Sequence, residues 1–150
     1  MTTSNEAGYA ATREVITRFY RAIELADIPL LRTAVTSDWE YVPGASGQPI
    51  GVEQLAPMLA DLLHALPDMK IILLDVLIHD AMVGVRAKIT GTQSGPFMGI
   101  PATSKAVDFA IHSFHELRDD RIAKTWHLED WLGLFRQIGE LPPGLANRPA

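Results

Sequence analysis

The second half of the chain carries four long strand-like segments in succession, and this feature most constrains the fold. The segments span residues 69–78, 82–92, 105–117 and 121–130. The first half predicts an amphipathic helix over 4–26, a short helix from 27, a strand over 38–42 and a helix over 51–66. Helices grouped before a mostly antiparallel sheet predict an α+β architecture. A long curved sheet that wraps such helices can form a cone around an apolar interior.

The composition excludes several classes of protein. With 150 residues, 47% of them hydrophobic, the chain predicts one globular domain with a core over about 5–140 and a Pro-rich tail over 141–150. A net charge of −5 without a basic patch makes a nucleic-acid partner improbable. The absence of cysteine excludes disulfides and thiolate chemistry. No signal peptide is recognisable and no apolar run reaches the ~20 residues of a membrane span, so we expect a cytoplasmic protein without membrane contact.

The stretch from Trp126 to Trp131 gathers two carboxylates, a histidine and two tryptophans at the end of the last expected strand. A strand period of two predicts one face carrying Ile122, Trp126, Leu128 and Asp130 and another carrying Thr125, His127 and Glu129. Asp130 then belongs to the apolar face, where a lone carboxylate is costly unless it is paired, protonated or used. Two interpretations are open: Asp130 transfers protons, with a pKa raised by burial, or it caps the helix expected over 132–138.

Three segments resemble the SnoaL-like polyketide cyclase (ester cyclase) family. The segment 91–103, Gly-Thr-Gln-Ser-Gly-Pro-Phe-Met-Gly-Ile-Pro-Ala-Thr, is similar to the family loop Gly-Thr-His-x-Gly-x-Phe-x-Gly-Ile-Pro-x-Thr. Leu66-Pro67-Asp68 is similar to its Phe-Pro-Asp, and 126–134 to its Trp-x-x-x-Asp-x-x-Gly-Leu end. Gln93 replaces the usual histidine of the loop, and Asp119-Asp120 replaces the usual Asp-Gly turn.

The resemblance implies the cone-shaped α+β fold shared with nuclear transport factor 2, scytalone dehydratase and ketosteroid isomerase, with a pocket that uses no cofactor. It also implies that an aspartate near the end of the last strand acts as acid and base in an intramolecular aldol closure. Asp130 is the residue that matches this motif. We therefore expect proton transfer on a hydrophobic, carbonyl-containing small molecule, by cyclisation or by a related isomerisation, dehydration or hydrolysis. The alternatives are a non-catalytic binding or assembly module, and an epoxide hydrolase that pairs Asp130 with Arg86 around a water.

Further residues are candidates for the pocket, each with a structural alternative. Arg86 interrupts an apolar strand, so it either polarises a substrate carbonyl or forms an ion pair on the outer sheet face. The expected apolar and aromatic lining consists of Trp39, Tyr41, Met58, Phe97, Phe109 and Trp126. All of these are equally consistent with core packing.

The position of His112 depends on the register of the last hairpin. A two-residue turn at Asp119-Asp120 pairs Leu117 with Ile122, Ser113 with Trp126, His112 with His127 and Phe109 with Asp130. In this register His112 lies on the other face of the sheet from Asp130. A bulge near 110–111 would turn His112 into the pocket. A metal site of His112, His127 and Glu129 matches no standard spacing, so we expect neither metal nor cofactor.

The outer face of a curved sheet needs cover, and this predicts a homodimer or higher homo-oligomer. The candidates for its polar interface are Thr125, His127, Glu129 and Lys88.

Overall fold

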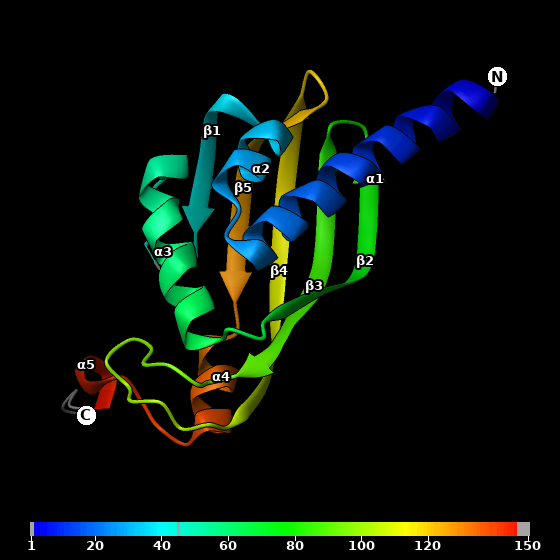
Figure 1. Ribbon diagram of the computed structural model, residues 1–150. Coiled ribbons are helices and arrows are strands. Elements are labelled where there is room, and N and C mark those ends of the chain that lie inside the picture. Colours follow the sequence, from blue (N-terminus) through cyan, green and yellow to red (C-terminus); the bar gives the residue numbers. More distant parts are fainter. Residues whose placement is uncertain (1, 45, 147–150) are drawn as a thin grey trace.

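The computed structural model describes residues 2–44 and 46–146 (Figure 1). The helices are α1 (Thr2–Leu25), α2 (Ile28–Ala34), α3 (Val52–Ala65), α4 (Trp131–Ile138) and α5 (Pro143–Ala146). The strands are β1 (Val35–Pro43), β2 (Lys70–His79), β3 (Met82–Thr92), β4 (Ala106–Arg118) and β5 (Arg121–Glu129). The expected Pro-rich tail contains α5, and its residues 147–150 lie outside the described residues.

The strands form a five-stranded sheet in the order β1-β5-β4-β3-β2, in which β1 pairs parallel with β5 and the other pairs are antiparallel. Helices α1 and α2 cross the concave face of this sheet, α3 lies beside β1, and α4 lies at the end of β4 and β5 (Figure 1). This arrangement confirms the α+β architecture predicted from the order of the elements. Within the described residues, no helix has the length and apolar character needed to cross a membrane.

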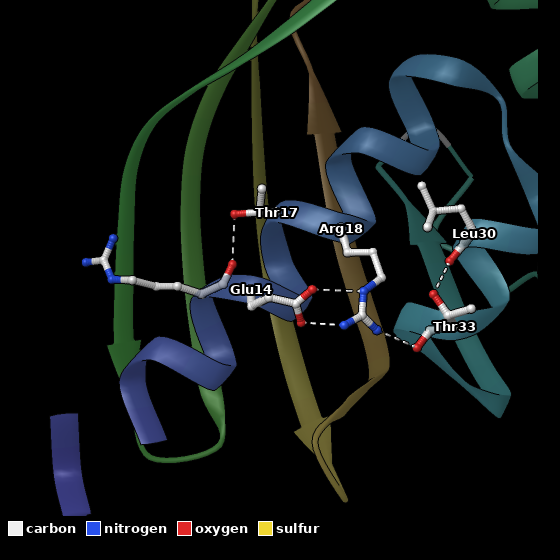
Figure 2. A network of polar contacts seen from close by, with 6 residues as sticks. Glu14, Thr17, Arg18, Leu30 and Thr33 are labelled. Atoms are coloured by element: carbon white, nitrogen blue, oxygen red, sulfur yellow. Dashed lines mark hydrogen bonds and ion pairs between the residues drawn. The ribbon is translucent and has the colours of Figure 1, made fainter. Parts of the chain in front are cut away.

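The N-terminal helices pack on the sheet because α1 has one apolar face. Val15, Ile16, Phe19 and Tyr20 are buried at the three- and four-residue spacing of a helix. Arg18, on another part of the surface of α1, pairs with Glu14 and donates to the carbonyl of Thr33 at the end of α2 (3.1 Å; Figure 2). The side chain thus holds the two helices together at their exposed side.

One extra residue in β5 decides which side chains enter the interior. Leu117 pairs with Ile122 as expected, but Glu116 pairs with Lys124, so Ala123 is left over as a bulge. Beyond it, the pairs are His115 with Thr125, Phe114 with Trp126, Ser113 with His127 and His112 with Leu128. The regular register predicted for this hairpin is therefore wrong by one residue. A bulge exists, but at Ala123 and not near 110–111.

Because side chains alternate between faces, this slip inverts the predicted faces of β5 beyond the bulge. Ile122 and Thr125 are both fully buried, although residues three positions apart in a regular strand would face opposite sides of the sheet. Trp126 and Leu128, expected in the interior, lie on the outer face, and Leu128 is 63% exposed. His127, expected at the back of the sheet, faces the interior.

Candidate active site

The concave side of the sheet opens into a cavity of about 530 Å³. It lies between α3, the segment 96–99 and the start of α4. Its lining residues are Tyr41, Pro43, Leu55, Met58, Leu59, Asp61, Leu62, His64, Pro96, Phe97, Met98, Gly99, Glu129 and Trp131. A mostly apolar cavity of this volume fits a small organic molecule.

Three of the expected lining residues, Tyr41, Met58 and Phe97, border the cavity. Trp39 and Phe109 lie one layer behind it and are buried. The ring of Trp39 is 5.7 Å from that of Tyr41, and the ring of Phe109 is 5.9 Å from that of Trp131.

Asp130, the residue matched by the family motif, is exposed and does not line the cavity. Its Oδ1 accepts the backbone N–H of Gly133 at 2.9 Å and so caps α4. A Cβ at position 133 would come within 2.2 Å of this carboxylate, so a side chain there would displace the cap. The capping interpretation therefore describes the geometry of Asp130, and its expected place on the apolar face is wrong because of the bulge at Ala123.

Three other candidates also lie away from the cavity. Arg86 is on the outer face, where its Nε donates to Asp75 Oδ2 at 2.6 Å, as the ion-pair alternative predicts. Trp126 and His112 are exposed on the same outer face. The geometry needed by an epoxide hydrolase, Arg86 and Asp130 around one water in the pocket, is not formed.

Glu129 is the carboxylate that reaches the inner part of the cavity. It lines the main cavity and also a smaller space of about 40 Å³ deeper in the cone, next to Tyr20 and His127. Its side chain is 19% exposed, and its Oε1 accepts a hydrogen bond from His127 Nε2 at 2.9 Å. His127 Nδ1 in turn lies 2.7 Å from the hydroxyl of Ser113. The carboxylate is thus oriented from behind and open to the cavity in front.

A second group of buried polar side chains lies deeper. His115 Nδ1 is 2.9 Å from Thr125 Oγ1, which accepts the indole N–H of Trp39 at 3.1 Å. His115 Nε2 is 2.9 Å from the hydroxyl of Tyr20. Burial disfavours the charged imidazole and, with a smaller effect of His127, lowers the pKa of His115 from 6.5 to about 3.

The two buried phenols are also perturbed. Burial raises the pKa of Tyr20, and an interaction with the Ser113 hydroxyl partly opposes this. Burial, followed by the negative charge of Glu129 and then by Tyr20, raises the pKa of Tyr41. Both phenols therefore remain protonated and can serve as hydrogen-bond donors over the physiological pH range.

The metal site considered from the sequence is divided by the sheet. His127 and Glu129 contact each other inside the cone, whereas His112 projects from the outer face next to Leu128 and Arg86. These three side chains do not converge.

The interior polar residues were not predicted from the sequence. Ser113 and His115 were not candidates, and Thr125, His127 and Glu129 were assigned to the outer face. One signal for them exists in β4, where Val107, Phe109 and Ile111 are followed at the same period by Ser113 and His115. The alternation in β4 is unbroken, and following it would have placed both polar residues inside.

The fold is an α+β cone, and its curved sheet encloses an apolar cavity with a carboxylate on the inner wall. These features place the protein in the class of small cone-fold proteins. Within this class, the model of the family "SnoaL-like polyketide cyclase" matches residues 14–138. The chain belongs to this family. A search of curated proteins gives no match.

Solved structures share the fold. A SnoaL-like polyketide cyclase candidate from Jannaschia sp. CCS1 is 25% identical, with a TM-score of 0.77 over 89% of this chain and 94% of that one. IdmH from Streptomyces antibioticus, a candidate polyketide cyclase, is 24% identical, with a TM-score of 0.78 over 85% and 98% of the two chains. AclR from Streptomyces galilaeus, a candidate hydroxylase, is 18% identical, with a TM-score of 0.78 over 91% and 87%.

Proposed function

We propose that the protein is a cofactor-independent acid/base enzyme that acts on a hydrophobic, carbonyl-containing small molecule. Glu129 transfers the proton, and the reaction class is intramolecular aldol cyclisation or a related isomerisation, dehydration or hydrolysis. The observation that carries this proposal is the Glu129 carboxylate on the inner wall of an apolar cavity, held at Oε1 by His127. Glu129 takes the role that the family resemblance implies for its neighbour Asp130.

The cyclisation needs one group that first accepts and then delivers a proton. The Glu129 carboxylate removes a proton from a carbon next to a carbonyl, and the resulting enolate carbon forms a bond to a second carbonyl carbon of the same molecule. The electron pair of that carbonyl moves to its oxygen, which then takes the proton back from Glu129. No electron acceptor or donor is required, and the carboxylate is regenerated.

The walls of the cavity suit a flat, unsaturated substrate. The aromatic side chains of Tyr41, Phe97 and Trp131 line it, and the rings of Phe97 and Trp131 lie 5.4 Å apart. Aromatic walls bind planar rings by stacking and desolvate the carboxylate between them. The substrate class is therefore an aromatic or polyketone compound of a few fused or foldable rings.

The test uses 2-tetralone, a bicyclic ketone whose α-protons exchange with solvent. We expect the protein to accelerate this exchange in D₂O, followed by ¹H NMR, and E129Q to reduce the acceleration about 100-fold or more. D130N is the matched control, because asparagine caps a helix as well as aspartate does. Full exchange activity in a folded E129Q would refute the role of Glu129, and its loss in a folded D130N would assign the proton transfer to Asp130.

A second candidate is a binding or assembly module without turnover. The observation that favours it is that Asp130, the residue that matches the family's catalytic motif, is engaged in capping the backbone of α4. This candidate predicts that 2-tetralone binds, with saturable changes in the fluorescence of Trp131, while its exchange rate stays at the buffer value.

We also propose a homodimer formed through the outer face of the sheet. Phe114, Trp126 and Leu128 are exposed there side by side on β4 and β5. Lys88 lies on this face as expected, paired with Asp108 at 2.7 Å, whereas the other interface candidates Thr125, His127 and Glu129 face the interior.

A second copy is the occupant that fits this face. Charges of both signs flank the apolar patch, namely the pairs of Lys88 with Asp108 and Arg86 with Asp75, and such a surface can complement itself about a two-fold axis. We expect light scattering at micromolar concentration to give a dimer and the L128E variant to give a monomer. A monomeric native protein at that concentration would refute the dimer.

A further inference from the structure

The Tyr41 hydroxyl is a hydrogen-bonding group on the wall of the cavity. Tyr41 is 7% exposed and borders both the main cavity and the smaller space deeper in the cone. None of the residues 2–44 and 46–146 forms a hydrogen bond with this hydroxyl, whereas the Tyr20 hydroxyl pairs with His115 Nε2 at 2.9 Å. Thr36 Oγ1 is the one described side-chain N or O atom that is both sealed from solvent and unpaired, so the Tyr41 oxygen still meets open space. An unpaired hydroxyl in such a place is available to a ligand.

The backbone and the ring of Tyr41 are held on several sides. Its N–H donates to the carbonyl of Ile50, and its carbonyl accepts the N–H of Ile50, both at 2.8 Å. On the other side of β1, Tyr41 pairs in parallel with Thr125. The ring centre lies 5.7 Å from that of Trp39 and 5.6 Å from that of His127. The hydroxyl therefore has a defined place before a ligand binds, as a preorganised catalytic donor requires.

Tyr41 and Glu129 face the same two spaces from the neighbouring strands β1 and β5. The negative charge of Glu129 contributes to the raised pKa of Tyr41, yet no hydrogen bond joins the two side chains. His127 Nε2 lies 2.9 Å from Oε1 of Glu129, and His127 Nδ1 lies 2.7 Å from the Ser113 hydroxyl. These contacts hold Glu129 at Oε1 and leave Oε2 without a partner among the described residues. A hydrogen-bond donor and a base thus share the wall, each with one atom unpaired.

We propose that Tyr41 is a second catalytic residue, whose hydroxyl donates a hydrogen bond to the substrate carbonyl oxygen while Glu129 removes a proton from the adjacent carbon. The proposal rests on the proposed function of Glu129 and adds the group that stabilises the enolate oxygen. The electron pair of the C–H bond forms a carbon–carbon double bond, the π pair of the carbonyl moves to its oxygen, and the proton passes to Oε2 of Glu129. Tyr41 keeps its own proton throughout, so no further acid and no electron donor takes part.

The surroundings of Tyr41 suit a hydroxyl that donates without ionising. Burial and then the charge of Glu129 raise the pKa of the phenol, so it stays protonated while Glu129 is ionised. When the proton has moved to Glu129, the negative charge lies on the substrate oxygen. A hydrogen bond to a charged oxygen is roughly twice as strong as one to a neutral carbonyl. The bond therefore strengthens along the reaction, and its loss should lower kcat more than it weakens substrate binding.

The direct test is infrared difference spectroscopy of 2-tetralone labelled with ¹³C at the carbonyl and bound to the full chain. A ketone oxygen that accepts a hydrogen bond has a weaker C=O bond, so we expect the stretch of the bound ketone to lie below its value in cyclohexane. Y41F should return the stretch toward that value. Y20F is the matched control, because it also removes a buried hydroxyl, but one that pairs with His115 and lies outside the main cavity. The stretch in Y20F should equal that in the native protein.

The deuterium exchange of 2-tetralone gives the second readout. We expect Y41F to lower kcat about 100-fold and to weaken binding of the ketone by no more than about fivefold. A native stretch equal to that in cyclohexane would overturn the proposal without the use of any variant, and so would a failure of the ketone to bind. A folded Y41F that exchanges at the native rate would also overturn it. Full activity of E129Q, together with a lowered stretch in the native protein, would refute the function of Glu129 and support the hydrogen bond from Tyr41.

Discussion

The burial of His115 predicts how the free energy of unfolding depends on pH. Its imidazole is fully buried between Tyr20 and Thr125, and burial lowers its pKa from 6.5 to about 3. The folded protein therefore resists protonating a group that the unfolded chain protonates readily. Between these two pKa values the unfolded state binds more protons, so acid favours unfolding. The stabilisation is complete above pH 6.5 and is lost as the pH falls toward 3.

The two pKa values of His115 set the magnitude. Proton linkage with values of 6.5 and about 3 gives a loss in unfolding free energy of about 2 kcal/mol between pH 7.5 and pH 5. The limiting slope is about 1.4 kcal/mol per pH unit, which corresponds to one proton taken up on unfolding. Asp38 and Asp68 also have pKa values lowered below their ordinary 3.8, the first by its neighbours Thr36 and Arg118 and the second by hydrogen bonds that it accepts from Thr92. Both carboxyl groups titrate below pH 5 and leave this window clear.

The assay is urea denaturation at half-unit steps from pH 7.5 to pH 5, for the native protein and for H115Q. Glutamine has no titrating group, so we expect the free-energy difference between the two proteins to shrink by about 2 kcal/mol over this range, whatever H115Q costs at pH 7.5. H79Q is the control, because the His79 side chain is 93% exposed, and it should follow the native curve. Parallel curves for the native protein and H115Q would show that His115 does not stay neutral in the folded state.

Three further predictions concern the structure around the site. Gln93 bonds to three residues of the loop that borders the cavity, including Thr103, so Q93A should speed amide hydrogen exchange across that loop and cost about 1–3 kcal/mol in urea denaturation. D130A removes the bond to Gly133 and should lower the unfolding free energy by about 1 kcal/mol, a loss that D130N avoids. Deletion of Ala123 should leave a cooperative urea transition, because Ile122 and Lys124 then become neighbours and the pairs from Lys124 onward, with the faces of their side chains, stay the same.

The elements of this fold could be predicted because their signals are local. Turn residues and alternation located β4 and β5 closely, and the expected two-residue turn is present. Asp119 and Asp120 both have positive φ, 53° and 59°, in the connection of this hairpin. The order of the helices and strands then gave the α+β class. In each of these steps, the residues that carry the information lie next to each other in the chain.

The inner wall could not be predicted because it depends on a register that no local residue marks. Ala123 is small and neutral, and nothing in its side chain distinguishes a bulged from a paired position. Beyond the bulge, β5 also pairs in parallel with β1, with Tyr41 next to Thr125, and these partners lie far apart in the sequence. A one-residue error there exchanged pocket and surface for every later side chain of β5.

The same exchange links the two proposals made for this chain. Strand alternation means that Glu129 cannot enter the cavity unless Leu128 leaves the interior, and His127 and Trp126 are related in the same way. The bulge at Ala123 thus places apolar side chains on the outer face and turns a carboxylate and an imidazole toward the interior. Exposure of Phe114 and Leu128 is unfavourable in a monomer, so the outer face gains from a second copy that covers it. The position of Glu129 inside the cone and the apolar patch on which the proposed dimer rests are thus both consequences of one inserted residue.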